Sequence, residues 1–344
     1  MKIQVLTTTI LLFAAATSLS AQGNVYCIDL AQTDFEHYDL LNQDIDDKKM
    51  VMIGEMHYMA ANSILQTDLW IHLNKQRGVR HLLIEFGEAE AYLYNQYLQT
   101  GDAWYLRHTF QGFNHYEQFM SDWKTLYEYN AGLDKDKKLV VHGLDLEREP
   151  GLSAAMYSLL APYTENPQVE SLRDSIQARL DTIGVERNTL AYTNVLRESI
   201  SALSPTEALP EGENKRIISK ILENPSNYLE LEKRDANMAQ KFQELDTIDA
   251  VYLGQFGAGH AMLNGRDVLA GILHRQEDYK DKILVMNMFD QRQDSNNPAP
   301  FEAVSDCPVF LYRIDPADPQ LKGWSKRGQW VLVLRDQPSY ARQK

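Results

Sequence analysis

The sequence has few cysteines, few long apolar runs and too little positive charge to balance its acids. Two cysteines in 344 residues exclude a disulfide-rich scaffold. The 34 basic residues face 48 acidic ones, and the formal net charge of −14 disfavours nucleic acid and anionic membranes as partners. There are no internal repeats and no low-complexity tracts, so we expect an ordinary globular protein.

Three familiar catalytic motifs are also missing. The chain contains no Gly-x-Ser-x-Gly elbow, no Walker-type phosphate loop and no His-Glu-x-x-His sequence. Readings as a serine esterase, a nucleotide enzyme or a zincin peptidase therefore lose support.

The longest apolar run lies at the N-terminus. Lys2 precedes the largely apolar segment Ile3–Ala16, and small residues follow just before Gln22. This order is typical of a secretory signal peptide, with a retained membrane anchor as the alternative. We predict that residues 1–21 are a signal peptide. The mature chain, 22–344, is then a periplasmic or secreted bacterial protein without a stable membrane span.

The two cysteines, Cys27 and Cys307, lie near opposite ends of the mature chain. In an oxidising compartment they can form one disulfide bond between the N-terminal segment and a late strand. Two separate buried thiols are the alternative, and the sequence does not decide between them.

Short apolar runs alternate with helical patterns along the chain. Strands are expected at Met50–Ile53, His81–Phe86, Leu139–His142, Ala250–Gln255 and Ile283–Met288. Helices are expected at Asn62–Gln76, Ala89–Leu98 and Tyr116–Ala131. Strands separated by helices indicate a parallel sheet with right-handed crossovers. We therefore predict an α/β fold, an open and mostly parallel sheet with helices on both faces.

The connection between the third and fourth expected strands is long and helical in pattern. We expect a helical subdomain at about 151–245 within a single α/β domain, with a proline-rich loop at Ser204–Gly212. Two later apolar runs, Val309–Ile314 and Gln329–Arg335, are expected to extend the sheet, with antiparallel pairing at its edge.

Charged residues follow four of the expected strands. The first strand runs into Glu55 and His57, the second ends near Glu85, the third leads to Asp145, and the fourth leads to His260. In open α/β sheets, ligands bind beyond the carboxyl ends of the strands. We therefore expect these five side chains to meet at one edge of the sheet.

A helix expected near Tyr228–Leu245 has an apolar stripe that is interrupted by Asp235. A carboxylate on a buried face is costly unless it is paired. A structural salt bridge with Arg234 is one explanation. We favour another, in which Asp235 orients a site histidine or Arg234 binds a substrate anion. His142 either faces the same site or lies beneath it.

Two chemistries fit this cluster. In the first, a histidine acts as general base for water attack on an ester, amide or lactone, and a carboxylate fixes its tautomer. A second histidine or Arg234 then steadies the oxyanion. In the second, a divalent metal (Mn, Co or Zn) activates water and is held by ligands drawn from His57, His260, Glu55 and Glu85.

Four short motifs occur in order along the chain: Gly54-Glu55-Met56-His57, Ile84-Glu85-Phe86, Arg234-Asp235-Ala236-Asn237-Met238-Ala239 and Gly257-Ala258-Gly259-His260. Together they resemble the superfamily that joins erythromycin esterases, ChaN-like haem-binding proteins and Tiki/TraB metalloproteases. The first is similar to the Gly-Glu-x-His opening of the ChaN-like branch. The third resembles a helix motif of the esterase and ChaN-like branches. The first and last resemble the paired Gly-x-x-His of the Tiki/TraB branch.

The resemblance implies a catalytic group with two supporting residues: Glu55, His57, Glu85 and His260, supported by Arg234 and Asp235. The esterase motif is typically Gly-Glu-x-x-His-Gly, whereas here the histidine comes one residue sooner and Tyr58 follows it. The long helical connection is more like that of the esterases.

The leading expectation is an exported hydrolase of the erythromycin-esterase-like type that acts on a small-molecule or peptide substrate. The first alternative is a haem or iron-cofactor binding protein in which histidines, Tyr58 or Tyr116 ligate iron. The second alternative is a metal-dependent peptidase.

Overall fold

The computed structural model describes residues 24–335, apart from 31–34, 36–38, 58, 110–116, 183–188, 204–208, 210, 225–230, 247–249, 291–300 and 302–303. The expected signal peptide, Tyr58, Tyr116 and most of the proline-rich loop lie outside the described residues. Among the described helices, none has the length and apolar character that crossing a membrane requires.

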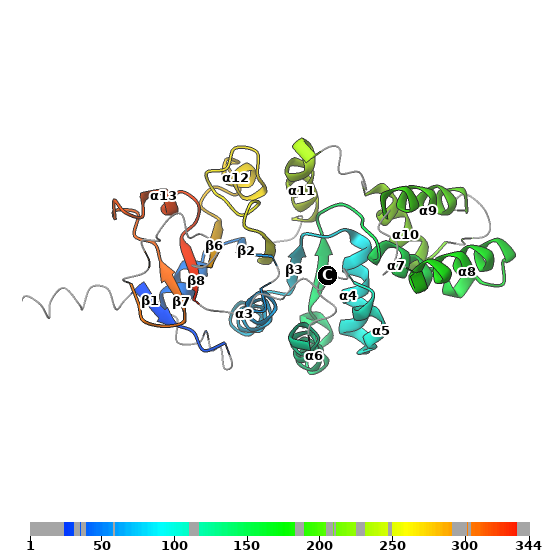
Figure 1. Ribbon diagram of the computed structural model, residues 1–344, viewed down its shortest axis with the longest axis horizontal. Helices are drawn as coiled ribbons and strands as arrows, with labels where there is room; N and C mark the ends of the chain where they lie inside the picture. Colours follow the sequence, from blue (N-terminus) through cyan, green and yellow to red (C-terminus); the bar gives the residue numbers. More distant parts are fainter. Residues whose placement is uncertain are drawn as a thin grey trace, which may run out of the picture.

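A sheet of eight described strands, in the order β1-β7-β8-β6-β2-β5-β3-β4, forms the centre of the protein (Figure 1). The strands are β1 Val25–Cys27, β2 Met50–Glu55, β3 His81–Ile84, β4 Val140–Gly143, β5 Tyr252–Gly257, β6 Ile283–Asp290, β7 Val309–Arg313 and β8 Trp330–Leu334. All neighbours from β8 to β4 pair in parallel, whereas β7 is antiparallel to both β8 and β1. The predicted α/β fold with a mostly parallel sheet and an antiparallel edge is confirmed.

Helices cover both faces of the sheet. The described helices are α2 Asp39–Ile45, α3 Ala61–Arg77, α4 Glu88–Thr100, α5 Ala103–Arg107, α6 Glu117–Ala131, α7 Gly151–Leu159, α8 Pro167–Thr182, α9 Thr189–Leu203, α10 Glu213–Glu223, α11 Leu231–Leu245, α12 Leu269–His274 and α13 Lys322–Ser325, with short 3-10 turns at Lys135–Lys137 and Ala161–Tyr163. In Figure 1, α3 and α6 lie on one side of the strands, and α11 and α12 lie on the other.

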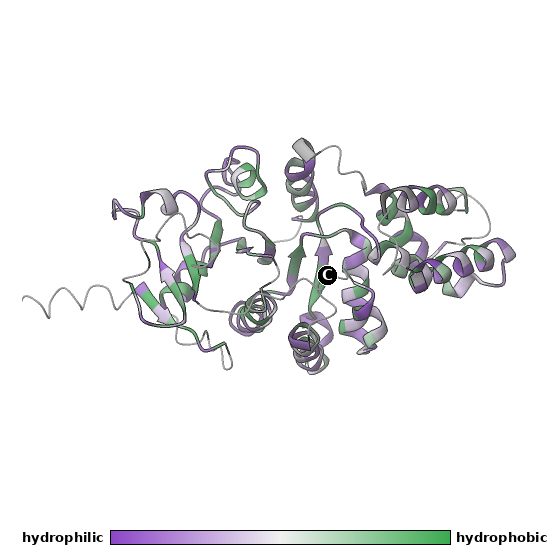
Figure 2. Ribbon diagram, viewed as in Figure 1, coloured by the Kyte–Doolittle hydropathy of each residue, from purple (hydrophilic) through white to green (hydrophobic). Residues whose placement is uncertain are grey.

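The sequence of β2 explains why it is central. All six of its residues are buried, as expected for a parallel strand that is covered on both faces. Val51 and Ile53 pack into the apolar cluster of α3 and α6, whereas Met50 and Met52 pack into the cluster of α11 and α12. Figure 2 shows the hydrophobic colour on β3 and β6 and much hydrophilic colour on α6.

The connection from β4 to β5 holds two kinds of helix. Helices α7 to α10 share an apolar cluster with α4, and α8 to α10 gather at one end of the molecule (Figure 1). Helix α11 instead packs its buried Met238 and Phe242 against the sheet and α12. The chain therefore leaves the sheet after β4 and returns with α11 lying beside the ends of the central strands.

Strand β1 was not predicted, because three residues are too few to show a periodic pattern. It pairs with β7, with Cys27 opposite Phe310. Of the two alternatives for the cysteines, the structure has the disulfide bond between Cys27 and Cys307, with the two Cα atoms 5.7 Å apart. This bond fixes the described N-terminal strand to the antiparallel edge of the sheet.

Replacing Cys27 and Cys307 by serine should destabilise the protein by about 2–4 kcal/mol, because the bond closes a very long loop in the unfolded chain. The midpoint of urea unfolding should fall for the double variant, and reductant should lower the wild-type midpoint to the same value. Equal midpoints for the oxidised wild type and the double variant would contradict this role.

Candidate active site

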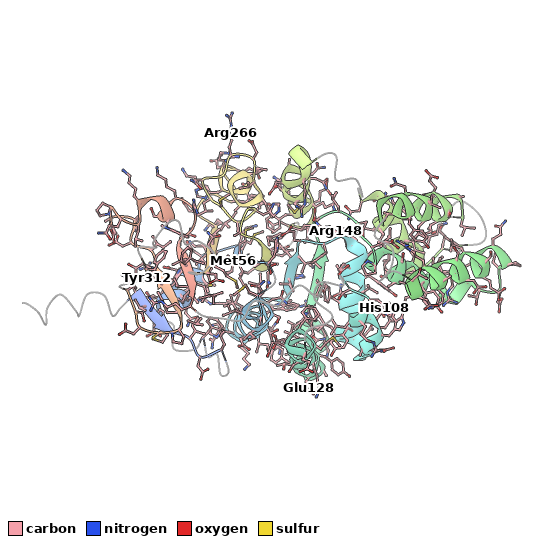
Figure 3. The ribbon with its side chains drawn as sticks, viewed as in Figure 1. Met56, His108, Glu128, Arg148, Arg266 and Tyr312 are labelled. Atoms are coloured by element: carbon pink, nitrogen blue, oxygen red, sulfur yellow. A yellow bond between two sulfur atoms is a disulfide. The ribbon has the colours of Figure 1, made fainter. Side chains whose placement is uncertain are left out.

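Acidic residues or a glycine lie at or just after the carboxyl ends of four neighbouring strands. Glu55 is the last residue of β2, Gly257 is the last residue of β5, and Glu85 follows β3 directly. Asp145 lies two residues beyond β4. Because β2, β5, β3 and β4 are adjacent and parallel, these groups share one edge. Figure 3 labels Met56 and Arg148, which mark the segments that follow β2 and β4.

Glu85 lies at the centre of the cluster and is mostly buried. Its Oε2 accepts a 2.6 Å hydrogen bond from the Gly257 backbone N–H, and its Oε1 accepts one of 2.6 Å from Arg234. The His260 Nε2 atom lies 3.4 Å from Oε1. Burial alone would raise the pKa of Glu85, but these donors and charges hold it well below its usual range. Glu85 is therefore an anion at neutral pH.

His260 is held between two carboxylates. Its Nδ1 lies 2.7 Å from Asp235 Oδ1, which also accepts a 2.6 Å hydrogen bond from the Leu269 backbone N–H. Burial lowers the pKa of His260, but Asp235 and Glu85 together raise it to about 9. His260 is therefore an imidazolium at neutral pH and donates from both ring nitrogens.

His57 has one carboxylate behind it and is more exposed. Its Nδ1 lies 2.9 Å from Glu55 Oε1, and 55% of its side chain is accessible to solvent. The other oxygen of Glu55 accepts a hydrogen bond from Gln255 Nε2. The hydrogen bond with Glu55 raises the pKa of His57 above 6.5. The proton on Nδ1 points to Glu55, so the neutral ring carries its lone pair on Nε2.

Because Gly257 has no side chain, His57 and Glu85 can lie close together on either side of it. A Cβ atom at this position would lie 2.9 Å from His57 Cε1 and 3.2 Å from Glu85 Oε2. Any larger residue would push His57 away from Glu85, so the close approach depends on the missing side chain.

Arg234 joins helix α11 to the sheet. Besides Glu85, it contacts Asp145 through Nε at 2.8 Å and through a terminal nitrogen at 2.5 Å. Burial lowers the pKa of Arg234, but Asp145 and Glu85 raise it above its usual range. Its guanidinium thus bridges two acids of the protein.

Two predicted site residues lie behind the cluster. Asp145 is fully buried and holds Arg234 and Arg148, so its contacts suit a positioning role more than contact with substrate. His142 Nε2 lies 2.9 Å from His81 Nδ1, and burial lowers the pKa of His142 to about 3. Of the two expected places for His142, the structure has the one beneath the site.

Three residues of the site were not predicted: Arg148, Gln255 and the Leu269 backbone N–H. Gln255 could have been predicted from the sequence, because an amide in the apolar run Tyr252–Gly257 is unusual. Arg148 lies on a loop and carried no pattern. A backbone donor such as that of Leu269 leaves no trace in a sequence.

The described residues do not offer a ready metal site. Among them, no group of three or more His, Cys, Asp or Glu side chains is placed to hold a metal ion. The donor chemistry agrees, because the Arg234 guanidinium and the Gly257 N–H already occupy the oxygens of Glu85. Tyr58 and Tyr116, named for the haem alternative, lie outside the described residues.

No protein-family model matches the chain, and no curated protein matches it by sequence. The chain is similar in fold to a protein from Bacillus cereus, at TM-score 0.61 and 14% identity over 93% of this chain and 97% of that one. It is also similar to a mutant of the erythromycin esterase EreC in its open conformation, at TM-score 0.60 and 13% identity over 93% and 99%. A succinoglycan biosynthesis protein matches at TM-score 0.61 and 13% identity over 93% and 96%. The chain therefore shares its fold with an erythromycin esterase, which belongs to one of the branches that the motifs resemble.

Replacing Asp235 by Asn should make the protein less stable at pH 6 but not at pH 9.5. The folded-state pKa of His260, about 9, is above the unfolded value of about 6.5. The proton on His260 therefore stabilises the fold fully below pH 6.5, and this contribution is lost as the pH rises through 9. The whole shift corresponds to about 3 kcal/mol, and Asp235→Asn should remove part of it because Glu85 also raises this pKa.

Urea unfolding at pH 6, 7.5 and 9.5 measures this effect, with the exposed Asp267→Asn on the neighbouring loop as a matched control. A deficit of the Asp235→Asn variant that stays constant across this range would mean that His260 does not carry the proton.

Proposed function

We propose that the protein is a hydrolase in which His57 is the general base for water attack on the carbonyl carbon of an ester, lactone or amide. The Glu55–His57 pair carries the proposal: the carboxylate holds Nδ1, and the basic Nε2 belongs to a ring that is half exposed to solvent. A positioned base of this kind suits proton removal from water.

The proposed reaction needs one base and one site of positive charge. The oxygen of water forms a bond to the carbonyl carbon while its proton moves to His57 Nε2. Glu55 and Glu85 stabilise the resulting imidazolium. The carbonyl oxygen becomes an oxyanion, and the cationic His260 lies near enough to His57 to stabilise it electrostatically. His57 then returns the proton to the leaving oxygen or nitrogen as its bond to carbon breaks.

Two further observations support the wider proposal. The fold is shared with an erythromycin esterase, whose name denotes cleavage of an ester bond. We therefore propose an ester or lactone as the first substrate class to test. The disulfide between Cys27 and Cys307 is typical of exported proteins. It supports the expected periplasmic or secreted location.

Replacing His57 by Ala should lower kcat by about 10²–10⁴-fold, the usual contribution of a general base. Glu55→Gln and His260→Ala should also abolish most turnover while circular dichroism shows an unchanged fold. The measurement is hydrolysis of a panel of aryl esters and lactones. The matched control is His108→Ala, since His108 follows α5 and contacts Trp104; Figure 3 labels it.

Full activity in Glu55→Gln or His260→Ala would contradict the assignment of the site. The same preparation, purified without chelator, is suited to elemental analysis and an absorbance spectrum. Near-stoichiometric Mn, Co or Zn would favour the metal-dependent peptidase, and iron with a Soret band would favour the haem-binding protein.

The pH dependence of hydrolysis should follow His57. Because the hydrogen bond with Glu55 raises the pKa of His57, kcat/KM should rise with pH through a limb that lies above 6.5. In Glu55→Gln the charge that stabilises the imidazolium is gone, so the limb should move to lower pH and the plateau should fall. An acid limb at the same pH in both proteins would show that another group controls the rate.

A further inference from the structure

Gln255 occupies a position that packing alone would give to an aliphatic residue. It lies on β5 in the middle of the sheet, in register with Ile53 of β2 on one side and Ile84 of β3 on the other. Both neighbours belong to the apolar cluster on the α3 and α6 face, as does Leu253 two residues earlier. An amide among these side chains is unfavourable unless it makes hydrogen bonds.

The amide of Gln255 is only half satisfied. Its Nε2 donates to Glu55 Oε2, whereas its Oε1 is buried and finds no donor among the described residues. The reverse orientation would put the amide oxygen against a carboxylate oxygen, where two acceptors repel. Glu55 therefore decides which way the amide points. A buried acceptor without a partner costs free energy. The hydrogen bond from Nε2 to Glu55 is the contact that this orientation of the amide makes possible.

Glu55 is in turn fixed by the same contact. Its two oxygens point in different directions, Oε1 to His57 Nδ1 and Oε2 to Gln255 Nε2. A carboxylate held at one oxygen can rotate about its last side-chain bond, whereas one held at both oxygens cannot.

We propose that Gln255 is a positioning residue of the proposed hydrolase, whose side-chain amide locks the Glu55 carboxylate in the orientation that directs it at His57. The proposal rests on the proposed function for its effect on rate, but not for the contact itself. Gln255 does not reach the reacting atoms, and it acts only through Glu55.

A double-mutant cycle separates this role from simple packing. Gln255→Met keeps the length of the side chain, suits the apolar surroundings and removes the amide. In the wild-type background it should lower kcat by about 10-fold, the factor that one net hydrogen bond is worth, with KM unchanged. In the Glu55→Gln background the same change should lower kcat by less than about 2-fold, because the group through which it acts is already altered.

The titration of His57, followed by NMR without any substrate, gives a second readout. Gln255→Met should move the pKa of His57 toward 6.5, since the rotating carboxylate faces Nδ1 for less of the time. Glu85 and His260 also act on His57, but Gln255→Met leaves both in place. In the Glu55→Gln background, Gln255→Met should cause no further change in this pKa.

Gln329→Met is the matched control. Gln329 lies directly before β8, and its side-chain amide bonds to the backbone of Val285 and Ile283 in β6. This variant should lose stability while the pKa of His57 and kcat stay at their wild-type values.

The outcomes distinguish the two proposals. An equal loss of kcat in both backgrounds, or an unchanged pKa of His57 in Gln255→Met, would overturn the positioning role. Wild-type kcat in Glu55→Gln would instead overturn the proposed function, and the NMR titrations would still decide whether Gln255 acts on His57 through Glu55.

Discussion

The site depends on keeping one carboxylate, Glu85, ionised in a largely buried place. An isolated buried anion is costly, and donors must replace the water that it loses. Here the donors are the Gly257 backbone N–H, the Arg234 guanidinium and the His260 ring. They come from β5, from α11 and from the segment after β5. Satisfying Glu85 therefore requires two separate parts of the chain, α11 and the end of β5 with the turn after it, to meet at the end of β3.

The helical connection between β4 and β5 supplies part of this site, because it contains α11. Helix α11 brings Arg234 to Glu85 and Asp145, and it brings Asp235 to His260 and the Leu269 N–H. Removing one partner of such a network leaves its other member buried without compensation, which is more costly than the pair is worth. The ion pairs therefore fix α11 against the sheet edge as well as setting the charges of the site.

Much of the fold followed from the sequence because its central strands are short, apolar and separated by amphipathic helices. The carboxyl-end rule then predicted that Glu55, Glu85 and His260 would share one edge. The strand order did not follow, since it depends on crossovers that no local pattern records. β5 lies between β2 and β3, and this order alone puts Gln255 beside Glu55.

The sequence predicted which residues belong to the site better than it predicted which of them contact each other. Asp235 was expected to be paired because it interrupts an apolar stripe, but the sequence offered both Arg234 and a histidine as its partner. The structure pairs it with His260 and pairs Arg234 with the two other acids. The role of Asp145 differs for a similar reason, because a residue just after a strand can point to solvent or into the protein, and only the packing of Arg234 decides.

The motif resemblance implies one catalytic group for both histidines, but their surroundings give the two rings different properties. His260 is buried between Asp235 and Glu85, and each ring nitrogen faces an acid. Its pKa is therefore about 9, and it remains protonated at neutral pH. His57 has Glu55 at its Nδ1 and is half exposed, a setting that suits proton exchange with a bound water or a leaving group. Environments that push apart the pKa values of two like residues are how a site assigns one to a fixed charge and the other to proton transfer. On this ground His57, and not His260, is the general base of the proposed hydrolase.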